Sequence, residues 1–195
     1  MKAQSCFRNS YEDDSCIFKP VNDFALFAGF SCGRDDLDDY VQNDAHQHDQ
    51  EMLSRTYSFH IKNEDGNVSA PVAFVSLAND AVRLSNRKKA KVFPPGLQYR
   101  VYPAVKICRL GSHQECQRKG IGSYLLWALK TLFLSENRTG CRFVTVDAYN
   151  DQGTLGFYQK NDFEFQNKED VEASTRILFY DLMRFKESVV NSQLT

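Results

Sequence analysis

A short loop with two glycines has the composition of an anion-binding site: Gln117-Arg118-Lys119-Gly120-Ile121-Gly122. It follows an apolar run over 102–110 and precedes a helical pattern over 121–134, so it connects a strand to a helix. The first N–H groups of a helix have no partner within it and carry the positive end of its dipole. Glycine lets an anion approach the backbone closely. The loop therefore predicts a cradle for a pyrophosphate.

Three phosphate-binding motifs compete for this loop. A Walker A loop needs a lysine directly after its second glycine, and Ser123 stands there. A Rossmann fingerprint needs a third small residue three positions later, where the chain has Leu125, and no βαβ unit precedes the loop. The pattern that remains is Gln/Arg-x-x-Gly-x-Gly/Ala. It resembles the acyl-CoA loop of the GCN5-related N-acetyltransferases (GNATs), which implies that Gln117 through Gly122 bind acetyl-CoA.

A second cluster follows about one strand later, at 147–150 and 157–163. GNAT chains commonly carry an Asn at this strand end and a helix end similar to F-Y-x-x-x-G-F. Here Asn150 and Phe157-Tyr158 match, and Asp162 replaces the glycine. Aspartate also tolerates left-handed backbone angles, so a helix end at this position is preserved.

The resemblance implies a role for each matching residue. An amine attacks the thioester carbonyl directly, a backbone N–H stabilises the oxyanion, and Tyr158 donates a proton to the departing thiolate. Asn150 either hydrogen-bonds the pantetheine arm or caps a helix. Pantetheine would also pair with main-chain groups at the end of the preceding strand, at Leu110, Gly111 and Ser112. The general base is not identified. Nearby His113 is expected at the surface, and no partner is found for an acyl-cysteine mechanism.

The N-terminal half resembles one GNAT subgroup more closely. The matching segments are Phe30–Gly33, Leu37–Tyr40, Ala45, Ser54–Tyr57 and Cys108–Gly111. This subgroup includes toxins of bacterial toxin–antitoxin pairs, which acetylate the α-amine of aminoacyl-tRNA and are held by a ribbon-helix-helix antitoxin. The chain departs from them in its near-neutral charge. Its one dense basic stretch, 87–91, is either a phosphate contact or a solvated loop.

Length and composition set limits on the architecture. The chain of 195 residues predicts one GNAT domain over 15–185, with flexible ends over 1–14 and 186–195. A net charge of −1 does not indicate a generally basic, nucleic-acid-binding surface. No apolar run reaches transmembrane length and no signal peptide is present. The six cysteines show no zinc spacing, so we expect free thiols, no metal and a cytoplasmic protein.

Hydrophobic periodicity predicts an α/β fold with a mixed sheet and helices, in the element order of the GNAT fold. The resemblance to GNATs implies that the sheet is mostly antiparallel and flanked by helices. An amphipathic helix over 34–53 is expected to present Leu37, Val41, Ala45 and Met52 on one face. Helices are also expected over 121–134 and 154–160, and 83–98 reads as a loop with a short helix. Strands are expected over 16–20, 56–61, 71–77, 104–110, 143–148, 163–165 and 177–183.

The sequence favours an acetyl-CoA-dependent N-acetyltransferase that transfers acetyl to a primary amine of an unidentified acceptor. The alternatives are a toxin that acetylates aminoacyl-tRNA, with an antitoxin partner, and a non-catalytic acyl-CoA-binding sensor. Segments 35–53, 83–98 and 166–174 would line the acceptor groove, and no sign of charge prevails in them. A monomer and a homodimer are both compatible with the sequence.

Overall fold

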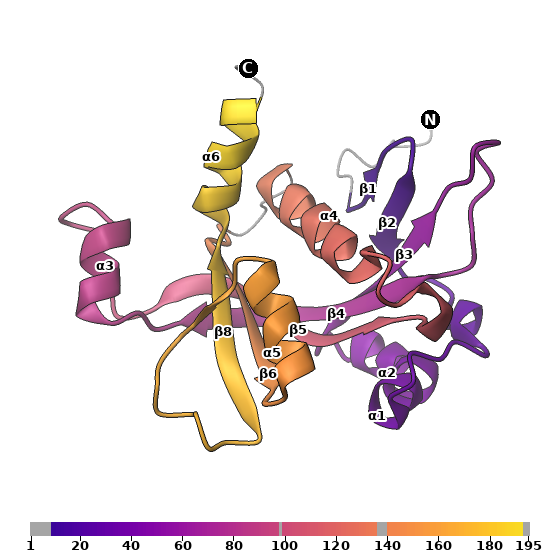
Figure 1. Ribbon diagram of the computed structural model, residues 1–195, viewed down its shortest axis with the longest axis horizontal. Helices are drawn as coiled ribbons and strands as arrows, with labels where there is room; N and C mark the ends of the chain where they lie inside the picture. Colours follow the sequence, from indigo (N-terminus) through magenta and orange to yellow (C-terminus); the bar gives the residue numbers. More distant parts are fainter. Residues whose placement is uncertain (1–8, 98, 136–139, 193–195) are drawn as a thin grey trace. The chain divides into compact units, whose positions relative to one another are not determined.

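The computed structural model describes residues 9–97, 99–135 and 140–192. Contacts divide the chain into two units, and strands β4 (Ala73–Val82) and β5 (Tyr102–Ser112) run through both (Figure 1). Unit 1 comprises Met1–Ala78 and Cys108–Arg138, and unit 2 comprises Asn79–Ile107 and Thr139–Thr195. The described strands are hydrogen-bonded in the order β1-β2-β3-β4-β5-β6-β8-β7. This open mixed sheet with flanking helices confirms the predicted α/β fold.

The strands of unit 1 are antiparallel neighbours. They are β1 (Tyr11–Glu12), β2 (Cys16–Pro20), β3 (Arg55–Ile61) and the first part of β4. In the β2–β3 register Phe18 faces Phe59, and both side chains are fully buried. Strands β2 and β3 lie where the sequence predicts them. Strand β1 lies within a segment where no element was expected, and residues 1–8 of that segment lie outside the described residues.

A helical run in unit 1 replaces the single helix predicted over 34–53. It consists of α1 (Asp35–Asp39), a π-helical turn η2 (Tyr40–Asp44) and α2 (Ala45–Gln50), after a 3₁₀ turn η1 (Phe24–Phe27). The predicted apolar residues Leu37, Val41 and Ala45 are buried as expected. Met52 was wrongly placed on that face, because it is 91% exposed and has a φ of 56°. Met52 lies two residues beyond the end of α2, so helical periodicity does not set its direction.

Helix α4 (Ile121–Ser135) packs against the first strands of unit 1. The face predicted for it is buried, at Leu125, Ala128, Leu129 and Leu132, and Ile121 is half-buried. The Tyr124 ring meets the Phe59 ring edge-on, with centroids 5.3 Å apart. A short 3₁₀ turn, η3 (Gln114–Cys116), separates β5 from the loop before α4. The helix that carries the glycine loop is therefore fixed by a packed apolar face.

Unit 2 contains both parallel and antiparallel strand pairs. Its further strands are β6 (Phe143–Tyr149), β7 (Glu164–Phe165) and β8 (Thr175–Asp181). Strand β6 runs parallel to β5, with Val144 opposite Val105, and antiparallel to β8, which also pairs with β7. The aromatic core of this unit includes Tyr102, Phe143 and Phe179. Its helices are α3 (Asn86–Val92), α5 (Gln152–Lys160) and α6 (Leu182–Ser192) (Figure 1).

Two helices of unit 2 refine the sequence prediction. Helix α3 is the short helix expected within 83–98, and Ser85 caps it by accepting a hydrogen bond from the Lys88 N–H. Helix α6 follows β8 directly, so the strand predicted over 177–183 ends at Asp181, and the helix occupies much of a segment expected to be flexible. Residues 193–195 lie outside the described residues. The single domain over 15–185 stays a prediction.

Candidate functional site

The loop after β5 has the backbone shape of a tight anion-binding turn. Arg118 and Gly120 both adopt left-handed φ angles, 59° and 83°. A side chain added at Gly120 would meet no atom within 4 Å, so the backbone there borders open space. Residues 117–120 are exposed. The loop is therefore not occluded, and a ligand can reach its main chain.

The N–H groups of this loop are the chemically important feature. Within residues 9–97, 99–135 and 140–192, no acceptor takes a hydrogen bond from the N–H groups of 118–123. The first helical bond of α4 runs from the Tyr124 N–H to the Gly120 carbonyl, at 3.0 Å. Unpaired N–H groups at a helix start, together with the helix dipole, favour a phosphate or a diphosphate. The donor set therefore fits the pyrophosphate of acetyl-CoA.

Gln117 holds this loop in place through its side chain. Its Nε2 donates to the Cys32 carbonyl oxygen at 2.6 Å and to the Ser112 carbonyl oxygen at 3.2 Å. Arg118 and Lys119 are exposed and form no ion pair with any described residue. The two cations therefore add positive charge to the exposed loop, and the glutamine positions its backbone.

Gly111 is required by the packing of the end of β5. It is buried, and a Cβ added to it would lie 2.7 Å from a Phe74 ring carbon and 3.3 Å from the Cys32 sulfur. The GNAT resemblance implies that pantetheine pairs with main-chain groups at this glycine. In the structure the close neighbours are Phe74 and Cys32. Leu110 and Ser112, on either side, are half-buried.

Asn150 uses its side-chain amide within unit 2. Its Nδ2 donates to the carbonyl oxygens of Val171 and Ala173, both at 2.8 Å. The helix-cap role considered for it belongs to Asp151, whose carboxylate accepts from the Thr154 N–H. The Asn150 side chain thus fixes the segment that joins β7 to β8. Its amide oxygen is the atom left for a ligand.

Tyr158 lies on α5 and is 5% exposed. Its ring contacts Phe157 and Phe163, with centroid distances of 5.0 and 5.3 Å. No described side-chain polar atom is both fully buried and unpartnered. No described residue forms a hydrogen bond with the Tyr158 hydroxyl. Burial raises the pKa of the phenol, which keeps it protonated at neutral pH.

The other candidates near the loop have structural roles. His113 caps η3, with its Nδ1 accepting from the Glu115 N–H, and its ring packs against Phe30. The cysteines considered for covalent chemistry, Cys108 and Cys116, are half-buried, and no described cysteine forms a disulfide. The described residues contain no cluster of three or more ligands suited to a metal ion. No described helix is long and apolar enough to span a membrane.

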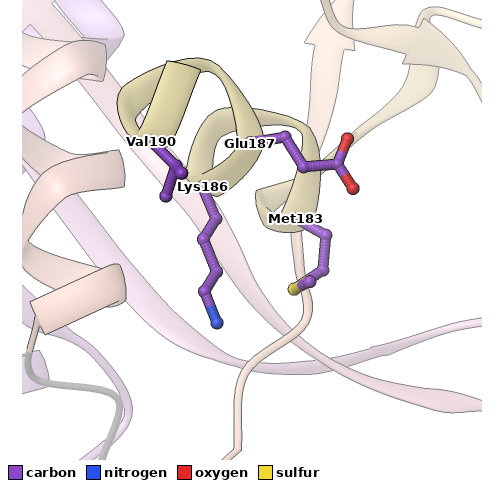
Figure 2. Close-up of a pocket in the computed structure, with 4 residues that line it drawn as sticks. All are labelled: Met183, Lys186, Glu187 and Val190. Carbon is purple, nitrogen blue, oxygen red and sulfur yellow. The ribbon is translucent and has the colours of Figure 1, made fainter. Parts of the chain in front are cut away.

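The structure groups the predicted residues into two sets. The strand end at 110–112 and the glycine loop lie in unit 1, and Asn150 and Tyr158 lie in unit 2. A separate hollow beside α6 is lined by Met183, Lys186, Glu187 and Val190 (Figure 2). None of the predicted site residues lines this hollow.

Sequence reasoning missed an aspartate that supports the loop helix. The Asp13 carboxylate accepts hydrogen bonds from the hydroxyls of Tyr11 at 2.8 Å and Tyr124 at 3.0 Å. It also accepts from the N–H groups of Ser15 and Cys16. Tyr124 follows the glycine loop by two residues, so this network holds the first turn of α4 to the β1–β2 hairpin. No sequence signal links these partners, because Asp13 and Tyr124 are 111 positions apart.

A family model described as the acetyltransferase (GNAT) family matches residues 25–163. No curated protein matches the sequence. Similar solved structures include a tyrosine-to-phenylalanine mutant of KacT, which is 17% identical with a TM-score of 0.69 and covers 89% of this chain and 98% of its own.

Two further structures concern the protein AtaT. AtaT complexed with acetyl-methionyl-tRNAfMet is 17% identical with a TM-score of 0.69, over 89% of this chain and 99% of AtaT. AtaTR bound with acetyl-CoA is 17% identical with a TM-score of 0.64, over 91% and 99%. At these identities the similarity establishes the fold.

Proposed function

Because the chain belongs to the acetyltransferase (GNAT) family and is a GNAT-type N-acetyltransferase, we propose that it transfers acetyl from acetyl-CoA directly to a primary amine. The amine attacks the thioester carbonyl within a ternary complex, and coenzyme A leaves as the thiol. The reaction needs an anion cradle for the cofactor, a backbone donor for the oxyanion and a proton for the thiolate.

The unpartnered N–H groups of 118–123 carry this proposal. They open onto free space at Gly120 and lie beside the exposed cations Arg118 and Lys119. A diphosphate placed there would receive several main-chain hydrogen bonds without displacing any described intramolecular bond. Gln117 supports the cradle from behind, and the end of β5 at 110–112 offers main-chain groups to the pantetheine arm.

Tyr158 is proposed as the general acid. Burial raises the pKa of the phenol and so keeps it protonated at neutral pH, and no described residue forms a hydrogen bond with its hydroxyl. The hydroxyl donates its proton to the thiolate as the carbon–sulfur bond breaks, and the amine proton is lost to water. Asn150 is proposed to receive pantetheine through its amide oxygen, since its Nδ2 is already bonded.

The test separates binding from chemistry. Isothermal titration with acetyl-CoA should show binding, and an absence of binding at millimolar acetyl-CoA would remove the proposal. Tyr158→Phe should lower kcat about 10²- to 10⁴-fold, with little change in acetyl-CoA affinity. Tyr180→Phe is the matched control, because Tyr180 is buried to the same extent in the same unit and has no proposed role. Unchanged turnover in Tyr158→Phe would defeat the assignment of the acid.

A second candidate function concerns the acceptor: the chain acts as a toxin that acetylates aminoacyl-tRNA. It is favoured by structural neighbours that include AtaT with acetyl-methionyl-tRNAfMet and the AtaT toxin bound to the antitoxin AtaR and acetyl-CoA. Under this proposal the chain works in a bacterial cytoplasm, as a monomer or homodimer, and a ribbon-helix-helix antitoxin restrains it.

This candidate has its own test. Aminoacyl-tRNA incubated with the protein and acetyl-CoA should yield N-acetyl-aminoacyl-adenosine after nuclease digestion, detected by mass spectrometry. Induced expression should arrest growth, and Tyr158→Phe should relieve the arrest. Acetylation of small amines but not of aminoacyl-tRNA would leave the first proposal and reject the second. Cofactor binding without turnover on any amine would identify a sensor instead.

A further inference from the structure

The positive charge of this chain is concentrated around one short helix of unit 2. Residues 81–114 contain eight of the 24 Arg and Lys residues and no Asp or Glu. The rest of the chain has 16 basic residues against 25 acidic ones. A net charge of −1 therefore conceals a cationic segment inside an otherwise acidic protein.

Helix α3 packs against the core of unit 2 through Lys88 and Val92, and other basic side chains of the helix face outward. The Lys88 ammonium donates to the Phe165 carbonyl oxygen at 2.8 Å and lies 4.4 Å from the centroid of the Phe179 ring. Val92, one turn further, packs against the aromatic core of unit 2. Helical geometry then turns Arg87 and Lys91 away from this inner face, on a shared outer face one turn apart.

Four cations form the α3 cation surface, which we define as Arg83, Arg87, Lys89 and Lys91. Lys89 is half-buried and the others are exposed. None of the four forms an ion pair with a residue in the described part of the chain. Like charges at this spacing repel each other, so the arrangement costs stability unless an anion neutralises it.

We propose that the α3 cation surface binds the phosphate backbone of the RNA acceptor. This inference rests on the second proposed function and adds the place where the RNA body would lie. Phosphate recognition needs positioned cations and no apolar centre. Protein interfaces, in contrast, are depleted in lysine and have an apolar core. Helix α3 carries Arg87 and Lys91 on its outer face and Lys89 on another side, and its apolar Val92 packs inward, which favours RNA over an acidic protein.

The experiment uses the full chain and a fluorescein-labelled RNA hairpin that carries no aminoacyl group. Binding is followed by fluorescence anisotropy over a series of salt concentrations. The triple variant Arg87→Ala, Lys89→Ala, Lys91→Ala should bind more weakly. Its slope of log K against log salt should fall by about one for each lost phosphate contact. The control removes equal charge elsewhere, at Lys19, Lys160 and Lys186, which are exposed.

Several results would overturn the proposal. The proposal is contradicted if the wild-type protein does not bind the hairpin, if the triple variant and the control lose equal affinity for it, or if the triple variant binds it as tightly as wild type. Tighter binding to phosphatidylserine vesicles or to an acidic peptide than to the hairpin would assign the surface to a membrane or a protein instead. Titration with acetyl-CoA and acetylation of a small amine are measured on the same samples. The proposal for the α3 cation surface and the proposal of acetyl transfer can therefore be rejected independently of each other.

Discussion

Removing the Asp13 carboxylate should destabilise the protein strongly, although this residue has no part in the proposed chemistry. Asp13→Ala would leave four donors without their acceptor: the hydroxyls of Tyr11 and Tyr124 and the N–H groups of Ser15 and Cys16. Water reaches some of these groups, so a net loss of about 0.5–1.5 kcal/mol for each bond applies. The free energy of unfolding should fall by about 2–4 kcal/mol. For a chain of this length that lowers Tm by roughly 5–15 °C.

The hydrogen bonds to Asp13 also make the loss of unfolding free energy in Asp13→Ala depend on pH. Burial alone would raise the pKa of Asp13, but hydrogen bonds from Tyr11, Ser15, Cys16 and Tyr124 outweigh it and lower the pKa to about 2. A carboxyl with a lowered folded pKa stabilises the protein above its unfolded pKa, near 3.9, and loses that contribution as pH falls towards about 2. The stability difference between wild type and Asp13→Ala should therefore be constant from neutral pH to about 5 and shrink below about 4.

Urea denaturation followed by circular dichroism measures this difference at each pH. Tyr11→Phe is the graded control, because it removes one of the four bonds and should cost about 1 kcal/mol. A Tm for Asp13→Ala equal to that of wild type would refute the reasoning. So would a stability difference that does not change as the solution is acidified.

Three further predictions follow from single sites. Gly111→Ala places a methyl group 2.7 Å from Phe74 and should cost about 1–3 kcal/mol in a urea titration, whereas no loss would mean that the ring moves freely. Burial lowers the pKa of His60. The neutral side chain therefore contributes stability above about pH 6.5, and this contribution is lost as the pH falls. Tm should drop between pH 7.5 and 5.5, and the drop should be smaller in His60→Gln. Gln117→Ala removes the bond to the Cys32 carbonyl and should weaken acetyl-CoA binding about fivefold in a calorimetric titration, with unchanged affinity counting against its positioning role.

Local patterns predicted most of the elements correctly. Strand β3 and helix α4 lie where alternating and 3.6-residue periodicities predict them, because each buries one face against a neighbour. The two glycines also marked the turn before α4 in the sequence. Gly120 has a φ of 83° there, a backbone angle that few other residues adopt. The family resemblance drawn from this loop is confirmed by the GNAT family match.

The prediction failed where distant contacts determine local structure. Strand β1 is two residues long and exists through its pairing with β2, so no periodicity signals it. Met52 was placed on the wrong face because the helix ends at Gln50 and Met52 follows it with a left-handed φ of 56°. Helix α6 has a buried side at Leu182 and Phe185, within a sequence that reads as polar.

The sequence by itself located the two features to which the proposed chemistry is assigned. They are a glycine loop at a helix start, suited to a diphosphate, and a tyrosine on the helix after β6. Those features depend on residues close together in the chain, whose backbone angles and periodicity can be inferred locally. Only the tertiary structure decided what each polar group binds. Gln117 donates to a carbonyl 85 positions away, and the Asn150 amide is engaged by the segment before β8. A hydrogen bond requires its donor and acceptor to lie about 3 Å apart in space, whatever their separation along the chain. The partner of each polar group is therefore set only when the fold brings donor and acceptor together.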